Sequence, residues 1–462
     1  MISSTLKGFT DAAASGTSAL TRRSISRRGF LAAAGGAVAL AAAACSGGKS
    51  LPGTQAPSGD AGSGSGTIQF WTDHSDDEVL NFKKVIANFN KDHPDIKVNL
   101  LNIADAAKYY TKVNTAAVGG NLADVYYART FDIASFVDKQ RVIPLTPLVD
   151  KSKSDVNPDD FWPAQVKQMS VGDQLYGLPY DFSNLAIYVN KTMFADAGVP
   201  VPTDDWTWDQ YFEIGANFVQ KSGSRQKRWG AGFQTYDWFM MGVFKSNGGD
   251  TFSDDLSQCV VNQPANVDFL AKLSDQMGKG VTPAPNATPA GVDPFAAGLV
   301  AMQVNGSWAT AQTRTAVGSK FEWDVIRLPK GTTGKREVSA AGGSWVIPPT
   351  SKNQDAAWTF TEYLASKASQ QVLIVDPLRS IPGRQSSAAD WSAKAKSSNQ
   401  PPKSIEIFPQ QMQEDAVAWA FPKFWTEFDT IWANRITTLG AGGDPAKILA
   451  QIQDDTNKAA AR

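Results

Sequence analysis

Cysteine and histidine are both scarce in this chain, which holds only two of each among its 462 residues. Cys45 closes a segment that is typical of an export signal, so Cys259 has no partner and we expect no internal disulfide, even in an oxidising compartment. Cys259 is predicted to be a small, buried, apolar residue. His74 and His93 are too few for a histidine-based zinc site and are not at ligand spacing. We therefore expect no bound metal and no cofactor.

The chain also lacks an excess of either charge, and it lacks a long apolar run. It holds 44 Lys and Arg against 45 Asp and Glu, a net charge of −1. Nucleic-acid binding usually requires a basic surface, so we do not expect it here. The run from Leu31 to Ala44 has 14 residues. A helix that spans a membrane needs roughly 20, so this run suits a cleaved signal better than a permanent anchor.

Residues 1–45 are predicted to be an export signal. Residues 26–31 form a twin-arginine pattern around Arg27 and Arg28, and the apolar run that follows stops at Cys45. Residues 42–45 are similar to a bacterial lipobox, in which the cysteine is lipidated and becomes the mature N-terminus. The match departs from the usual motif at Ala42, where a large aliphatic residue is common. A secreted protein that is cleaved after an Ala-x-Ala site, with Cys45 an ordinary residue, is the alternative.

Residues 46–66 are rich in Gly, Ser and Pro and have almost no large apolar side chains. Such a segment buries too little apolar surface to fold, so we expect a flexible tether. The 396 residues that follow it are too many for one simple core. Their number favours two lobes.

Strand-like and helix-like patterns alternate at the start of this long region. A strand at 67–71 is followed by a helix that begins with a capping box between Ser75 and Glu78. A strand at 96–100, a second helix that ends at Gly119 and a strand at 124–127 come next. This order predicts a parallel sheet, whose ligands sit beyond the carboxyl ends of the strands. Further elements are expected as strands at 321–328 and 341–347, helices at 206–218 and 355–366, and an exposed helix at 444–460.

Several short motifs occur in a fixed order along nearly the whole chain. They are Phe70-Trp71, Phe89-Asn90 with Pro94 to Val98, Ala123 to Val125, Gly177 to Pro179, Tyr188 to Lys191, Phe295 to Trp308, and Gly342 to Trp345. With the lipoprotein-like signal, this series resembles the extracellular solute-binding proteins of bacterial ABC sugar importers, the maltose-binding-like group. Each motif alone is weak evidence, but the complete order is strong evidence.

The resemblance implies an α/β, two-lobe periplasmic-binding-protein type II fold with a ligand cleft between the lobes. Lobe one would comprise 67–181 and 342–376, and lobe two 182–341 and 377–462, with hinge strands near 179–184 and 339–344. It implies a monomer that captures a carbohydrate, an oligosaccharide by preference, by hinge closure. The protein would deliver this ligand to ABC permease subunits from the outer face of the cytoplasmic membrane, held there through lipidated Cys45.

Hydroxyl groups of a sugar call for polar side chains, and its apolar faces call for aromatic rings. Asp73 and His74 follow the first strand, and Arg129 follows the third. Asp181 and Asn184 lie in the first hinge segment, which faces the cleft in relatives. The alternatives are a helix-entry residue for His74, a surface ion pair for Arg129, and backbone capping for the two hinge residues.

Other ligand contacts are expected from aromatic and glycine-rich motifs. Trp238 is a candidate stacking platform, with core packing as the alternative. Trp308, Gly343 and Trp345 belong to motifs that border the cleft in relatives, where glycine permits a close backbone approach. Arg384 is a candidate clamp for a hydroxyl or carboxylate, with a plain loop arginine as the alternative.

Two other functions agree with part of these observations. A lipid-anchored glycoside hydrolase would need two carboxylates roughly 5–9.5 Å apart, and no paired acid and nucleophile is visible in the sequence. A receptor for a phosphorylated or charged solute would need basic groups in the cleft, for which Arg129 and Arg384 are the candidates. The 14 tryptophans favour an uncharged sugar. We therefore expect a binding protein and not an enzyme.

Overall fold

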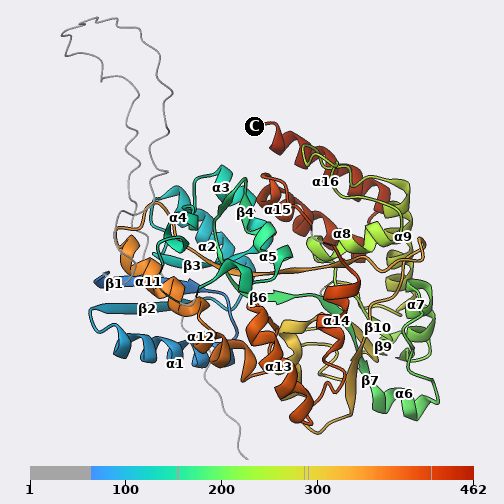
Figure 1. The fold of residues 1–462 in the computed structure, drawn as a ribbon. Coiled ribbons are helices and arrows are strands. Elements are labelled where there is room, and N and C mark those ends of the chain that lie inside the picture. Colours follow the sequence, from blue (N-terminus) through green and yellow to red (C-terminus); the bar gives the residue numbers. More distant parts are fainter. Residues whose placement is uncertain (1–63, 153, 155, 286, 290, 418) are drawn as a thin grey trace, which may run out of the picture. The chain divides into compact units, whose positions relative to one another are not determined.

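The computed structural model describes residues 64–462, apart from residues 153, 155, 286, 290 and 418 (Figure 1). The twin-arginine segment, Cys45 and most of the predicted tether lie outside the described residues. Within the described part, no helix combines the length and the apolar character that crossing a membrane requires.

A six-stranded sheet organises one part of the fold, in the order β15-β6-β14-β3-β1-β2. Its strands are β1 Gly66–Thr72, β2 Ile96–Asn102, β3 Val125–Arg129, β6 Leu178–Ser183, β14 Ala341–Val346 and β15 Ile381–Pro382. Strand β1 pairs in parallel with both β2 and β3, which confirms the sheet predicted from the first three strands. Strand β14 runs antiparallel to β3 and to β6, so the complete sheet is mixed.

Helices α1 (Asp76–Asp92) and α2 (Ala106–Val118) connect the parallel strands. The predicted capping box is present, since the Ser75 N–H donates to a Glu78 carboxylate oxygen over 2.8 Å. One face of α1 buries Phe82, Val85, Ile86 and Phe89. These caps and apolar faces hold the two helices on the sheet. Because β1 and β3 run parallel, their carboxyl ends lie at the same edge of the sheet.

A four-stranded sheet organises the second part, in the order β10-β11-β7-β12. Its strands are β7 Leu185–Asn190, β10 Ala231–Gly232, β11 Met302–Gly306 and β12 Trp323–Ile326. Alternate side chains of β7 enter two different apolar cores: Tyr188 enters one, and Ile187 and Val189 enter the other. Both faces of β7 are therefore buried, which explains why its sequence is an almost continuous apolar run. Only Asn184 separates β7 from β6, so the chain passes directly from the large sheet to the small one.

The remaining elements cover these sheets. The helices are α3 Ile133–Asp138, α4 Thr146–Val149, α5 Pro163–Gln168, α6 Lys191–Ala197, α7 Trp208–Ala216, α8 Asp237–Ser246, α9 Pro264–Lys279, α10 Thr310–Val317, α11 Gln354–Ala365, α12 Lys367–Gln370, α13 Gln385–Ser397, α14 Ile407–Glu414, α15 Trp425–Ile436 and α16 Pro445–Ala460. Single-turn helices are η1 Thr130–Asp132, η2 Pro158–Asp160, η3 Ser307–Ala309, η4 Gln371–Val375 and η5 Thr437–Ala441. Three two-stranded sheets pair β4 Ser170–Val171 with β5 Gln174–Leu175, β8 Gln220–Ser222 with β9 Arg225–Arg228, and β13 Val338–Ser339 with β16 Ala416–Val417.

The C-terminal helix differs from its prediction. We expected α16 to be exposed, but it buries Ile448, Leu449 and Ile452 and packs beside α15 and α9 (Figure 1). The sequence of α16 is mostly polar, which is why we expected an exposed helix. Its apolar residues recur at helical spacing, however, so they form one face that can pack on the core. Cys259 is buried and free, which confirms the prediction made for it.

Candidate functional site

A cavity of about 570 Å³ lies at the carboxyl ends of β1 and β3. We call it the main cavity. One wall belongs to the six-stranded sheet and carries Asp73 and Arg129, and a second wall carries Trp238 from α8 and Trp308 from η3. Six of the residues predicted for the ligand line this cavity: Asp73, His74, Arg129, Asp181, Trp238 and Trp308.

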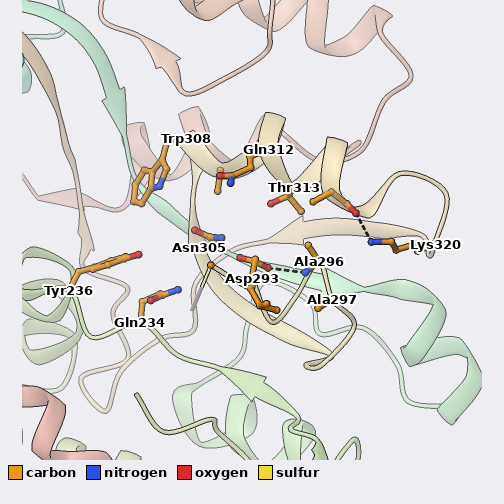
Figure 2. Close-up of a pocket in the computed structure, with 14 residues that line it drawn as sticks. Gln234, Tyr236, Asp293, Ala296, Ala297, Asn305, Trp308, Gln312, Thr313 and Lys320 are labelled. Carbon is orange, nitrogen blue, oxygen red and sulfur yellow. Dashed lines mark hydrogen bonds between the residues drawn. The ribbon is translucent and has the colours of Figure 1, made fainter. Parts of the chain in front are cut away.

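Two further cavities adjoin the main one. The second cavity has a volume of about 400 Å³ and shares Tyr236, Trp308 and Gln312 with the main cavity (Figure 2). The third cavity, also about 400 Å³, shares Ser75, Glu78, Trp308, Gln312 and Arg379 with it. Trp308 and Gln312 line all three cavities, so they mark the place where the three spaces meet.

The two residues after β1 differ in their burial and in their surroundings. The side chain of Asp73 is 9% exposed, and burial raises its pKa to about 6, opposed by the nearby Arg129. The His74 ring lies among aromatic rings, with ring centroids 4.9 Å from Phe82 and from Tyr127. Burial and the charge of Arg379 lower the pKa of His74 well below its ordinary value, so its ring is neutral.

Arg129 is held by carboxylates on both sides. Its Nε donates to Asp132 over 2.8 Å, and one terminal nitrogen donates to Asp429 of α15 over 3.1 Å. Its guanidinium also lies over the rings of Tyr110 and Phe131, at 3.8 and 4.5 Å from their centroids. Arg129 therefore joins β3 to α15, and much of the hydrogen-bonding capacity of its guanidinium is already used within the protein.

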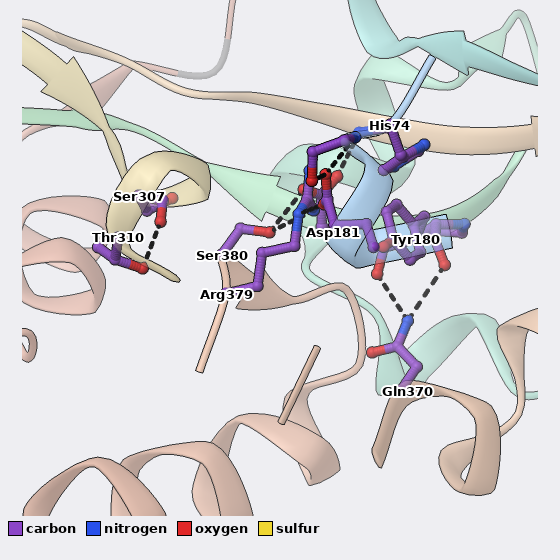
Figure 3. Close-up of polar contacts among 12 residues, drawn as sticks. His74, Tyr180, Asp181, Ser307, Thr310, Gln370, Arg379 and Ser380 are labelled. Carbon is purple, nitrogen blue, oxygen red and sulfur yellow. Dashed lines mark hydrogen bonds and ion pairs between the residues drawn. The ribbon is translucent and has the colours of Figure 1, made fainter. Parts of the chain in front are cut away.

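Asp181 of β6 is the centre of a buried polar cluster (Figure 3). One carboxylate oxygen accepts hydrogen bonds from Ser380 and from Arg379, each over 2.6 Å, and the other accepts from the Gly343 N–H over 2.9 Å. Arg379 also forms an ion pair with Glu78 of α1. Burial raises the pKa of Asp181 to about 6, while the bonds from Ser380 and Gly343 oppose the rise. Burial lowers the pKa of Arg379 to about 9.

Three aromatic side chains form a row along the second wall of the main cavity. Tyr236 and Trp238 are parallel within 3°, with centroids 6.5 Å apart, and Trp238 lies 5.8 Å from Trp308. Tyr236 is 40% exposed, whereas Trp238 is 9% exposed. The ring of Trp238 stacks on Phe131, with an angle of 22° between the rings, so the row is anchored in the core while parts of Tyr236 and Trp308 face the cavities.

Two predicted site residues have structural roles instead. Asn184 is fully buried, and its amide donates to the Phe408 carbonyl over 2.9 Å, which matches the capping alternative. At Gly343 a Cβ would overlap the ring of Tyr127, so the close approach that glycine permits there is to the protein's own side chain. Neither residue lines the main cavity, and a ligand contact at these positions stays a prediction.

Two further predicted site residues also lie outside the lining of the main cavity. Trp345 is completely buried near the end of β14, with its ring centroid 5.3 Å from that of Phe70 and 4.8 Å from that of Tyr180. The cavity lies at the end of the strands, whereas Trp345 lies further along the sheet. Arg384 is buried as well, and it donates to Asp160 over 2.8 Å and to the Ala365 carbonyl over 3.2 Å. It ties the start of α13 to its neighbours, outside the cavity.

Tyr236, Gln312 and Arg379 are among the residues that line the main cavity and were not predicted from the sequence. Tyr236 lies in the same short motif as Trp238, so its neighbour could have indicated it. Gln312 follows Trp308 by four residues, which places both on one helical face. Arg379 carries no local signal, because its position depends on Asp181 and Glu78, which are distant in the sequence. Among the described residues, no group of three or more His, Cys, Asp or Glu side chains is arranged to hold a metal ion.

Comparisons with known proteins define the class. A family model described as bacterial extracellular solute-binding protein matches residues 75–371, and the chain belongs to this family. The chain is similar to the lactose-binding protein of Rhizobium radiobacter, with 23% identity over 314 residues, 65% of this chain and 71% of that protein. It is also similar to the arabinooligosaccharide-binding protein of Halalkalibacterium halodurans, with 26% identity over 224 residues, 47% of each chain.

Solved structures share the fold. An ABC substrate-binding protein from Listeria monocytogenes, in complex with cycloalternan, superimposes with a TM-score of 0.75 at 24% identity, covering 85% of this chain and 98% of that one. The predicted fold class is confirmed: this is the two-lobed α/β fold of the maltose-binding type. The family and these neighbours are binding proteins. The lobe boundaries and the ligand contacts stay predictions.

Proposed function

We propose that this protein is the substrate-binding component of an ABC importer and that it captures a sugar in the main cavity. The observation that carries the proposal is the pairing of two walls of opposite character. Tyr236 and Trp308 offer aromatic surfaces on one wall, and Asp73 lies on the other. A sugar has apolar C–H faces that pack on rings and hydroxyls that donate to carboxylates, so it matches both walls.

The relatives support a carbohydrate ligand. The two similar proteins are described as binding lactose and arabinooligosaccharide, and the Listeria structure contains cycloalternan. At identities of 23–26% these descriptions suggest a ligand class and not a particular sugar.

A charged or phosphorylated solute is a weaker candidate. A phosphate would need basic groups with free donors in the cleft. The cavity holds Arg129 and Arg379, and each forms ion pairs with two carboxylates. Releasing either arginine would leave buried carboxylates without partners, which is costly. The site therefore favours an uncharged ligand.

The wider mechanism follows from the family and the predicted leader. We propose export by the twin-arginine route, lipidation of Cys45 and a monomer held at the outer face of the cytoplasmic membrane. In this proposal the lobes at 67–181 with 342–376, and at 182–341 with 377–462, close around the ligand, which favours the closed state by its greater affinity for it. The tether raises the concentration of the receptor near the permease. The ligand is released unchanged, so we propose no enzymatic activity.

The test is a titration of the mature protein, followed by tryptophan fluorescence and calorimetry. The panel contains lactose, maltose, mannobiose, arabinobiose, tagatose and mannitol, with glucose 6-phosphate as the charged comparison. We expect saturable one-to-one binding of at least one neutral sugar, which chromatography then recovers intact. Binding of glucose 6-phosphate alone, or hydrolysis of a bound disaccharide, would overturn the proposal.

A further inference from the structure

A hairpin formed by β8 and β9 concentrates positive charge in a chain that is otherwise acidic. Residues 1–45 hold five Lys and Arg and one Asp, which leaves 39 basic against 44 acidic residues in the rest of the chain. Residues 220–228 contain no acid and four basic side chains, those of Lys221, Arg225, Lys227 and Arg228. No Asp or Glu occurs between Glu213 and Asp237. We call residues 220–228 the basic hairpin.

Half-buried residues of β9 hold the basic hairpin in place. The Gln226 amide donates to the Arg228 carbonyl over 2.7 Å and to the Gly280 carbonyl over 3.0 Å. The Nε of Arg228 donates to the Phe218 carbonyl over 2.9 Å. An isolated two-stranded hairpin is only marginally stable, so these bonds to flanking segments fix its position.

The alternate residues of β9 have another role, because successive side chains of a strand point to opposite faces. Arg225 and Lys227 are exposed, and so is Lys221 of β8, whose ammonium donates to the Lys279 carbonyl over 3.2 Å. Among the described residues, none of these three cations forms an ion pair. Asp275, the acid nearest to Lys279 along α9, is already paired with the Lys279 side chain over 2.6 Å. Three positive charges are therefore available to an anionic partner.

The composition of the basic hairpin favours an extended anionic surface as this partner. Residues 220–228 include no aliphatic or aromatic side chain, whereas the core of a protein–protein interface is apolar and depleted in lysine. None of these residues lines the main, second or third cavity, so the hairpin is separate from the ligand site. Phosphate headgroups in a bilayer can pair with exposed lysine and arginine without a shaped pocket.

We propose that the basic hairpin contacts the anionic phospholipid headgroups of the membrane and so orients the protein on it. The inference rests on the proposed membrane location and is independent of which sugar is bound. The predicted tether of 21 residues has a typical end-to-end distance of about 25 Å. A lipid on Cys45 would limit the distance from the membrane and leave the orientation free. A basic surface patch is the usual complement to such an anchor.

Protection of the open strand edges is the other role that these cations can have. Lysine and other charged residues on an edge strand prevent pairing with the edge of another molecule. That role predicts self-association when the charges are removed, with no change in binding to lipid. The contact with lipid predicts the reverse, so one pair of variants distinguishes the two roles.

The test is sedimentation of the mature protein with lipid vesicles, with Cys45→Ser in every variant so that no acyl chain contributes. Vesicles of phosphatidylglycerol and phosphatidylcholine are compared with vesicles of phosphatidylcholine alone, in low and in high salt. One variant combines Arg225→Gln with Lys227→Gln. The control combines Lys91→Gln with Lys97→Gln, which removes two exposed charges elsewhere.

Wild type should bind the anionic vesicles in low salt and should bind neither the neutral vesicles nor, in high salt, the anionic ones. Each cation at an anionic surface contributes about fivefold to binding, so the hairpin variant should bind about 25-fold more weakly. The control variant should change by less than about twofold, because charges beyond the screening length contribute little. Sugar binding should be the same in all three proteins.

The other outcomes contradict the inference in different ways. No binding of wild type to anionic vesicles, or an equal loss in both variants, overturns it. Equally tight binding of soluble polyphosphate would show a general affinity for phosphate and overturn the lipid as partner. Binding to native membranes but not to pure lipid would assign the hairpin to a protein partner and also overturn it. Failure to bind any sugar would overturn the proposed function and leave the vesicle result to decide this inference.

Discussion

At the scale of the residue, two of the acids that line the main cavity are in a similar electrostatic situation. Asp73 and Asp181 are both buried, and both have a pKa raised to about 6. Asp181 is balanced by Arg379 and by two further donors. Asp73 has fewer partners, so its carboxylate is the better placed of the two to accept from a ligand.

Replacing Asp73 by Asn should change how stability depends on pH. The folded-state pKa is about 6 against an ordinary value of 3.8, so the folded protein binds this proton more tightly than the unfolded chain does. The contribution of Asp73 to the free energy of unfolding is therefore greatest below pH 4 and is lost as the pH rises to 6. Urea unfolding at pH 4 to 7 should show Asp73→Asn gaining stability relative to wild type over this interval. The exposed Asp173→Asn serves as the control, and a pH-independent difference for Asp73→Asn would contradict the prediction.

Two tryptophans should separate ligand binding from folding. Trp308 lines all three cavities, so Trp308→Ala should weaken sugar binding by on the order of 1–3 kcal/mol through lost stacking and contact area. Trp345 is completely buried, so Trp345→Ala should reduce the free energy of unfolding by about 3–5 kcal/mol. Trp345→Ala should lower the sugar affinity of the folded protein less than Trp308→Ala does. Calorimetry and urea unfolding measure the two effects, and a larger affinity loss in Trp345→Ala would restore its predicted place in the site.

At the scale of the element, α15 is attached to the rest of the protein in two ways. Its first turn forms polar contacts with α3 and the residue after it: Ser135 is hydrogen-bonded to Thr426 over 2.9 Å, and Lys139 forms an ion pair with Glu427 over 2.6 Å. Its other face buries Trp425, Phe428 and Trp432. The ion pair is partly exposed, with side chains 25% and 36% accessible, so water and salt weaken it.

Glu427→Gln should therefore cost at most about 1 kcal/mol of stability, and this cost should shrink at high salt. Phe428→Ala, one residue further along the same helix, should cost about 3–5 kcal/mol because it leaves a cavity in a closely packed core. Urea unfolding in low and high salt measures both changes. A larger loss of unfolding free energy in Glu427→Gln than in Phe428→Ala would mean that polar contacts, and not packing, hold α15.

At the scale of the whole molecule, the main cavity draws its walls from segments attached to both sheets. A ligand that contacts both walls should favour a more compact arrangement of them. Small-angle scattering should show a smaller radius of gyration when the sugar found in the titration is present. At a hundred times its dissociation constant, the same sugar should add about 2.7 kcal/mol to the free energy of unfolding. Trp308→Ala at the same sugar concentration is the matched control, and stabilisation without compaction would contradict hinge closure.

Much of this architecture could be predicted from local patterns. The capping box at Ser75 and Glu78 and the apolar face of α1 depend on residues a few positions apart, and they are present in the structure. The carboxyl ends of β1 and β3 meet because parallel strands with short crossovers leave no other arrangement. Asp73 and Arg129 therefore reach the same cavity, as the strand order predicts.

What the sequence by itself determined is the order of the elements and the edge of the sheet where the cavity lies, since both follow from short-range spacing and chain direction. The tertiary structure alone decided which side chains face that cavity. Arg379 belongs there through Asp181, 198 residues away, whereas Trp345 and Arg384 turn into the interior toward partners that are even more distant in the sequence. Burial and pairing depend on contacts between remote segments, and local spacing carries no information about them.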